Sequence, residues 1–226
     1  MGEIDGAELL SAGQRGVAID GLGDDGQRTV PAALLRECCH QLKDRIDPRG
    51  LRLSNVIVTG ALDLTGLVVP FPLRFEGCQF DTAPVVEGAH LFELALTGSP
   101  RLPGLLGNGL RLRRDLDLSR SNITGAHWTS ASTSKRAAVW LCESEIGGRL
   151  LCFDTVIDGQ GDRALQATGS GSAVRSGCWA GSAPWARSGC SERASAARST
   201  SPEPTSWPRR DRRSTSRTPP SRAACS

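Results

Sequence analysis

A short leucine motif returns at a regular interval along the chain and constrains the fold more than any other feature of the sequence. The motif is leucine, any residue, leucine or phenylalanine, and two polar or small residues. It begins at Leu51, Leu62, Leu73, Leu94 and Leu116, so the starts are 11, 11, 21 and 22 residues apart. Weaker copies, VVEGA and LLGNG, fill the two skipped places. This regularity predicts a winding fold with a double unit of about 22 residues.

Apolar residues also recur every five positions. The members are Ile57, Leu62 and Leu67; Val86, Leu91 and Leu96; Leu118, Ile123 and Trp128; and, after the polar segment 129–136, Leu141, Ile146, Leu151 and Val156. A helix requires apolar spacings of three and four, whereas the leucine pairs alternate as in a β-strand. Such short strands are stable only when they pair with copies on both sides, so we predict a β-solenoid over residues 50–167 with leucine ladders inside.

Small residues near the five-residue positions add a family resemblance. Ala89, Ser121, Ala126 and Ser144 lie two places before a central apolar residue, although leucine replaces the small residue at 94 and 116. The pattern resembles pentapeptide-repeat proteins, which implies a mainly β, right-handed quadrilateral β-helix of about twenty residues per coil, here with one or two more. The segments VPFPLRFEGCQFD and LDLSRSNITGA are similar to large actinobacterial repeat proteins, some of which carry the label membrane-associated oxidoreductase.

Residues 1–49 are predicted to cap the open end of the solenoid, which would otherwise expose unpaired strand edges. We expect a helix over about 31–44, with Thr29 as N-cap, Pro31 in the first turn and an apolar stripe of Leu34, Leu35, Cys38 and Leu42. The N-terminus is acidic and lacks the pattern of a signal peptide. No segment has the roughly 18 apolar residues of a membrane span, so we expect a cytoplasmic protein.

The composition changes abruptly near residue 168. Residues 168–226 contain no Leu, Ile, Phe or Met and a single Val174, with 10 Arg and 3 acidic residues, whereas residues 1–167 carry 17 basic and 21 acidic residues. A segment of that composition cannot form a core, so we predict a disordered basic tail. Our hypothesis is that a frameshift after about residue 165 produced it. Leucine repeats should then reappear in another reading frame.

Two segments superficially resemble functional motifs. GLGDDG at 21–26 matches the glycine pattern of dinucleotide-binding loops, but Asp24 and Asp25 would repel phosphate and Pro31 delays the helix. We interpret the segment as a glycine-rich turn. Cys38, Cys39 and His40 adjoin, yet adjacent helical cysteines diverge by about 100°, so they do not predict a metal site, and the cysteines as a whole do not predict a disulfide framework.

The acidic and histidine residues form no recognisable site either. Asp154, Asp158 and Asp162 lack the spacing of a calcium loop and predict a turn. His40, His90 and His127 have no nucleophile placed beside them by a known motif. The sequence therefore designates no catalytic, cofactor-binding or metal-ligating residue, and it implies no cofactor.

Four arginines raise the question of nucleic acid. Arg111 and Arg113 alternate with leucines, which indicates the outer face of a strand, and Arg114 and Arg120 lie nearby. Because residues 1–167 are net acidic, we expect no nucleic-acid binding beyond non-specific contacts of the arginine-rich tail.

Two classes of function remain. We expect a non-catalytic repeat protein that acts as a scaffold or binds an unknown protein partner. The alternative, which follows only from the family label, is a membrane-associated oxidoreductase whose cofactor region is missing from this chain. Flavin or haem absorbance of the purified protein would separate the two.

Overall fold

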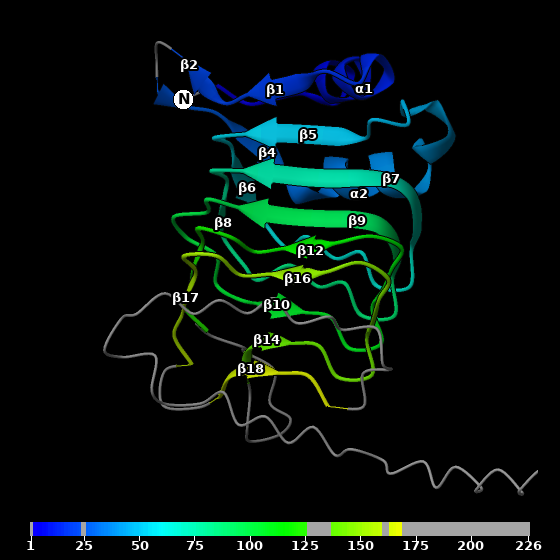
Figure 1. Ribbon diagram of the computed structural model, residues 1–226. Helices are drawn as coiled ribbons and strands as arrows, with labels where there is room; N and C mark the ends of the chain where they lie inside the picture. The colour runs from blue at the N-terminus through cyan, green and yellow to red at the C-terminus, as the bar shows by residue number, and fades with distance from the viewer. Residues whose placement is uncertain (1, 24–25, 126–136, 160–162, 169–226) are drawn as a thin grey trace, which may run out of the picture. The chain divides into compact units, whose positions relative to one another are not determined.

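Short parallel strands, aligned edge to edge, make up most of the computed structural model, which describes residues 2–23, 26–125, 137–159 and 163–168 (Figure 1). The helices are α1 (Gly6–Arg15), α2 (Ala32–His40) and a 3-10 turn (Lys43–Arg45). The strands are β1 (Ala18–Asp20), β2 (Leu22–Gly23), β3 (Gly26–Gln27), β4 (Thr29–Pro31), β5 (Leu51–Ser54), β6 (Ile57–Thr59), β7 (Val68–Glu76), β8 (Gln79–Phe80), β9 (His90–Thr97), β10 (Leu105–Leu106), β11 (Arg111–Leu112), β12 (Leu116–Asp117), β13 (Asn122–Ile123), β14 (Ala137–Trp140), β15 (Glu145–Ile146), β16 (Leu150–Leu151), β17 (Val156–Ile157) and β18 (Arg163–Gln166). The fold is mainly β, as predicted.

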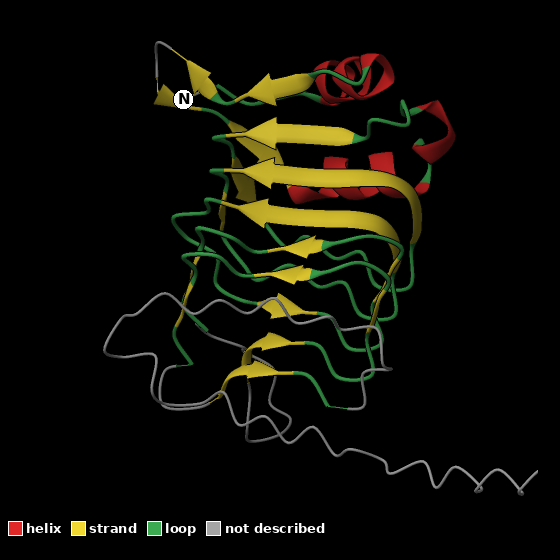
Figure 2. Ribbon diagram, viewed as in Figure 1, coloured by secondary structure: helices red, strands yellow, loops and turns green. Residues whose placement is uncertain are grey.

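The largest sheet runs β1-β5-β7-β9 and then divides, because the long strand β9 pairs with both β11 and β12. Strand β15 continues from β11, and β16 continues from β12. Smaller sheets are β4-β6-β8, β10-β14-β18 and β13-β17. All these pairs are parallel, and β2 with β3 forms an antiparallel hairpin. Figure 2 shows β5, β7 and β9 side by side, with α1 and α2 at the N-terminal end of the strands.

The register of the large sheet explains the leucine motif. Leu51 is paired with Leu73, Leu73 with Leu94, Leu94 with Leu116, and Leu116 with Leu150. Successive partners are therefore 22, 21, 22 and 34 residues apart. The double unit predicted from the sequence is thus the distance between paired strands. The 11-residue copy at position 62 lies elsewhere, since its Asp63 bridges to Val85.

The polar residue after each leucine pair has a backbone requirement of its own. Asn55, Gly77, Gly98, Arg120 and Asp154 all have positive φ angles, between 51° and 63°. Their amides are joined in series, because Asn55 N donates to Glu76 O at 2.7 Å and Gly77 N donates to Thr97 O at 2.8 Å. Left-handed backbone favours Gly and Asn, which is why these residues recur in the motif.

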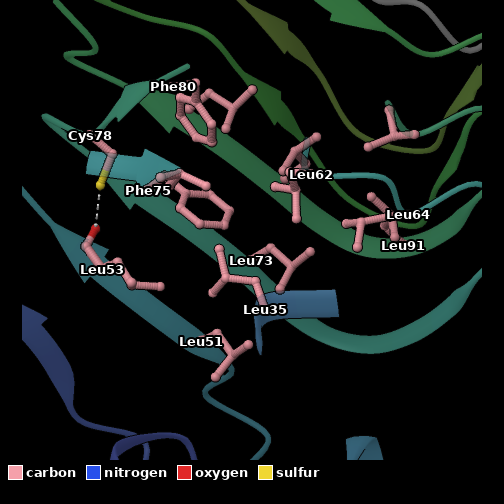
Figure 3. Close-up of a cluster of buried hydrophobic side chains, with 14 of the residues drawn as sticks. Leu35, Leu51, Leu53, Leu62, Leu64, Leu73, Phe75, Cys78, Phe80 and Leu91 are labelled. Carbon is pink, nitrogen blue, oxygen red and sulfur yellow. Dashed lines mark hydrogen bonds between the residues drawn. The ribbon is translucent and has the colours of Figure 1, made fainter. Parts of the chain in front are cut away.

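The leucine ladders form the core, as expected (Figure 3). Leu51, Leu73, Leu94 and Leu116 are each at most 2% exposed, and the edge of the Phe80 ring meets Phe75 with centroids 5.5 Å apart. The five-residue rhythm is less exact. Val56 and Val58 are buried while Ile57 and Leu67 are half-buried. Burial also declines after Ile146, since Leu151 is half-buried and Val156 is 40% exposed.

The N-terminal segment differs from the predicted single helix. Helix α1 was not predicted, although Asp5 caps it by accepting a hydrogen bond from Glu8 N at 2.8 Å and Gly16 ends it with φ of 61°. The prediction of Thr29 as the N-cap of a helix over 31–44 is wrong. Thr29 lies in β4, because pairing with β6 uses its backbone, and α2 begins after Pro31 and ends at His40.

This segment also supplies strands of its own. β1 pairs with β5, and β4 pairs with β6, so parallel pairing begins well before Leu51. Leu35 of α2 belongs to the same buried cluster as Leu51 and Leu73 (Figure 3). The predictions for the basic tail after Thr168, for segment 129–136 and for Ala126, His127 and Trp128 concern positions outside the described residues.

Candidate binding surface

Outward side chains of the large sheet line a shallow hollow. Along β5, β7 and β9, leucines and phenylalanines turn inward, so the residues between them face solvent. The hollow has a volume of about 450 Å³. Its lining residues, called the charged hollow below, are Ala18, Arg52, Leu53, Ser54, Arg74, Glu76, Glu93, Ala95, Thr97, Asp115, Asp117, Arg120 and Leu151. Arginines and carboxylates of both signs dominate the set.

Two ion pairs within the charged hollow join neighbouring strands or turns. Arg74 Nε lies 2.7 Å from Glu93 Oε1, which joins β7 to β9. Arg120 lies 3.9 Å from Glu76. All four side chains except Glu93 are at least 46% exposed, so each pair adds at most about 1 kcal/mol to stability. Their main effect is to hold four charged groups in fixed places.

Asp115 is held from two directions at the edge of the hollow. Its carboxylate accepts hydrogen bonds from the Arg149 backbone N at 2.7 Å and from the Arg149 guanidinium at 3.1 Å. Partial burial opposes ionisation, but these bonds and the charge of Arg114 bring the pKa of Asp115 below its ordinary value. Asp115 therefore stays ionised and is already satisfied.

Arg52 differs from the other arginines of the hollow. It is exposed, and it is paired in register with Arg74, so two like charges lie on adjacent strands. Such a pair is unfavourable unless an anion is nearby. Glu93 neutralises Arg74, but no carboxylate among the described residues pairs with Arg52. Farther along the same column, Asp117 accepts a hydrogen bond from Ser119 N at 2.9 Å and has no arginine partner in the described part of the chain.

A second group borders the hollow. The guanidinium carbons of Arg113 and Arg114 each lie 5.7 Å from the centre of the Phe92 ring. Consecutive residues of a strand point to opposite faces, but a bend at 113–114 brings both side chains to one ring. We call Phe92, Arg113 and Arg114 the arginine–phenylalanine cluster.

The structure places the other motifs apart from these surfaces. GLGDDG contributes to the β2-β3 hairpin, and no helix begins there, which agrees with a glycine-rich turn rather than a dinucleotide loop. His40 ends α2 and His90 begins β9. Asp154 occupies a left-handed turn and Asp158 follows β17. Within the described residues, no three His, Cys, Asp or Glu side chains are grouped so that they could hold a metal ion.

The buried cysteines belong to the core. Burial raises the pKa of Cys38 to about 11 and of Cys39 to about 12, and the negative charge of Glu37 adds to the effect at Cys38. Burial likewise raises the pKa of Cys78 to about 11. A protonated thiol is a poor nucleophile and a poor metal ligand, so these three residues act as small apolar side chains.

The sequence contained a signal for the hollow that the motif search did not use. The middle residue of the leucine motif is Arg52, Asp63, Arg74, Ala95 and Asp117 in its successive copies. Four of these five side chains are charged, and those on the large sheet all line the hollow. Glu93 and Asp115 carry no such signal, because they precede the motif at bends of irregular length.

Comparison of the chain with protein-family models, with curated proteins and with solved structures finds no match. In the described residues, no helix is long and apolar enough to cross a membrane. The functional argument for this chain therefore depends on the geometry of its charged surface.

Proposed function

We propose that the chain is a right-handed β-solenoid of the pentapeptide-repeat type and that it works as a non-catalytic scaffold whose charged hollow binds a protein partner. Parallel registration of strands 21 or 22 residues apart supports the solenoid. Each coil then contributes one strand to a common face, and outward residues from distant parts of the sequence meet there.

A single observation carries the binding proposal, namely the uncompensated charge of Arg52. The protein keeps an arginine beside Arg74 at the unfavourable position directly opposite a like charge. The neighbouring Arg74–Glu93 pair leaves Arg52 free to meet a carboxylate of a partner. Asp117, two strands beyond Arg74 in the same column, offers the opposite charge to that partner. Mixed charges of this kind favour a specific protein surface over a uniform polyanion.

The hollow contains nothing that resembles a catalytic arrangement within the described residues. No histidine or cysteine lines it, and two of its carboxylates have arginine partners within 4 Å. A general base needs a shifted pKa and a place beside a reacting group, and a nucleophile needs a base next to it. Neither is present among the lining residues, so recognition is the role that these side chains support.

The test uses Arg52→Glu and a matched control, Arg101→Glu, which makes the same charge change at an exposed site outside the hollow. Immobilised full-length protein is used to retrieve a partner, which is then purified and titrated against each variant. We expect Arg52→Glu to weaken the dissociation constant about tenfold or more and Arg101→Glu to change it less than about twofold. Equal effects would contradict the hollow as the binding face. Visible absorbance of a bound flavin or haem would contradict a non-catalytic role.

A further inference from the structure

We infer that the arginine–phenylalanine cluster is the anchor point for the partner and that it takes a short acidic segment of a protein chain. This inference rests on the proposed function, since it specifies which partner chemistry the charged face accepts. The cluster adjoins the charged hollow, because Arg114 is followed by Asp115, which lines it.

The cluster is fixed by backbone hydrogen bonds. Arg113 N donates to Leu91 O at 3.0 Å and Arg114 N donates to Phe92 O at 2.8 Å, so the bend at 113–114 is attached to β9 on both sides of the ring. Phe92 is half-buried, and both arginines are exposed. The two guanidinium groups are therefore held near one aromatic ring before any partner arrives, which reduces the ordering cost of binding.

The charge balance around the cluster is positive. Arg111 has a loose ion pair with Glu145 at 3.7 Å, and Asp115 is satisfied by Arg149. Arg113 has no carboxylate partner among the residues that the structure describes. Guanidinium forks match carboxylates in two-point geometry, and arginine with an aromatic residue is the usual composition of an interface centre.

The next turn of chain leaves room for a partner backbone. Gly147 N donates to Leu112 O at 2.8 Å and Gly148 N donates to Arg114 O at 3.2 Å, so two residues without side chains lie directly beside the cluster. An extended segment can therefore approach the arginines from this side without a clash.

The surrounding carboxylates favour a short acidic peptide over nucleic acid. Glu145 and Asp115 flank the cluster, and Glu93, Glu76 and Asp117 follow across the hollow. A nucleic-acid strand carries a phosphate at every nucleotide and would meet these anions on both sides. A peptide can place one or two carboxylates on the arginines and neutral or basic residues beyond them.

The experiment measures fluorescence anisotropy with the full chain and a labelled peptide of alternating Glu and Leu, about ten residues long. A peptide of alternating Lys and Leu and an oligothymidylate of similar length serve as comparison probes. The variants are Arg113→Ala, Arg114→Ala and Phe92→Leu, with Arg101→Ala as the matched control. We expect the acidic peptide alone to bind, each cluster variant to weaken binding about fivefold or more, and Arg101→Ala to leave it unchanged.

Three results would overturn the inference. They are equal binding of the acidic peptide to Arg113→Ala and to the unaltered protein, tighter binding of oligothymidylate than of the acidic peptide, and no binding of the acidic peptide. The separate assay of Arg52→Glu distinguishes this failure from failure of the proposed function. If partner binding still depends on Arg52, the chain binds protein through the hollow and only the assignment of the cluster is wrong.

Discussion

Replacement of Leu118 by alanine tests whether the inward ladder holds the protein together. Leu118 is fully buried. Its amide donates to Leu151 O at 2.8 Å, and its carbonyl accepts from Thr155 Oγ1 at 2.8 Å, so the next strand fixes its backbone. It follows the registered pair of Asp117 with Ala95, which places it beside the ladder position of Leu96. The side chain therefore cannot swing into water after a change nearby.

The expected loss follows from the atoms removed. Leucine to alanine deletes three carbon atoms, which at about 0.8 kcal/mol per buried methylene gives about 2.4 kcal/mol. If the fixed backbone prevents collapse, a cavity of about 80 Å³ adds about 2 kcal/mol at roughly 24 cal/mol per Å³. Partial relaxation lowers the second contribution, so we expect Leu118→Ala to reduce the free energy of unfolding by about 2–4 kcal/mol.

The assay is thermal and urea unfolding followed by circular dichroism, with Arg120→Ala as the control. Arg120 is exposed and loses only a 3.9 Å ion pair, so its replacement should change stability by less than about 0.5 kcal/mol. At about 2–4 °C per kcal/mol, Leu118→Ala should lower Tm by about 4–16 °C. Equal shifts in Tm for the two variants would refute the inward register of the ladder.

Three further substitutions test the turns and the buried thiols. A Cβ at Gly50, where φ is 81°, would overlap the Pro72 carbonyl oxygen, so Gly50→Ala should cost more than about 3 kcal/mol in urea unfolding, whereas Gly66→Ala (φ 67°, no neighbour within 4 Å) should cost about 1 kcal/mol. Because Arg120 has a φ of 60°, Arg120→Gly should unfold at a higher temperature than Arg120→Ala, and a lower Tm would contradict the left-handed turn. Burial raises the pKa of Cys78 to about 11, so the folded protein retains this proton to a higher pH than the unfolded chain does. Stability should then fall as the pH rises from about 9 towards 11, and Cys78→Ala should make this fall smaller in urea titrations at pH 8 and pH 10.

The repeat made most of the fold predictable. Because side chains alternate along a strand, the spacing of leucines alone identified Leu51, Leu73, Leu94 and Leu116 as equivalent positions, and the sheet pairs them in that order. The N-terminal segment was less predictable, since Thr29 satisfies the rules for a helix cap and also those for a strand. Pairing with β6 decided between them, and that interaction is not local in sequence.

The charged surfaces could be predicted only in part. Arg52, Arg74 and Asp117 occupy a fixed place in the motif, so their common face followed from the repeat once the register was known. The arginine–phenylalanine cluster could not be foreseen in this way. Arg113 was correctly predicted to face outward, but its convergence with Arg114 on Phe92 depends on a bend that interrupts the alternation.

The contrast between these two surfaces indicates how such a fold acquires a binding function. Regular strands can place outward side chains only in straight columns at the strand spacing of about 4.8 Å, which brings like charges such as Arg52 and Arg74 together. A bend breaks the column and lets consecutive side chains converge, as Arg113 and Arg114 do on Phe92. The regular part therefore supplies a rigid charged face, and the irregular part supplies a concentrated anchor. Because the two adjoin at Asp115, a partner that is held by the anchor lies next to the column that it must match.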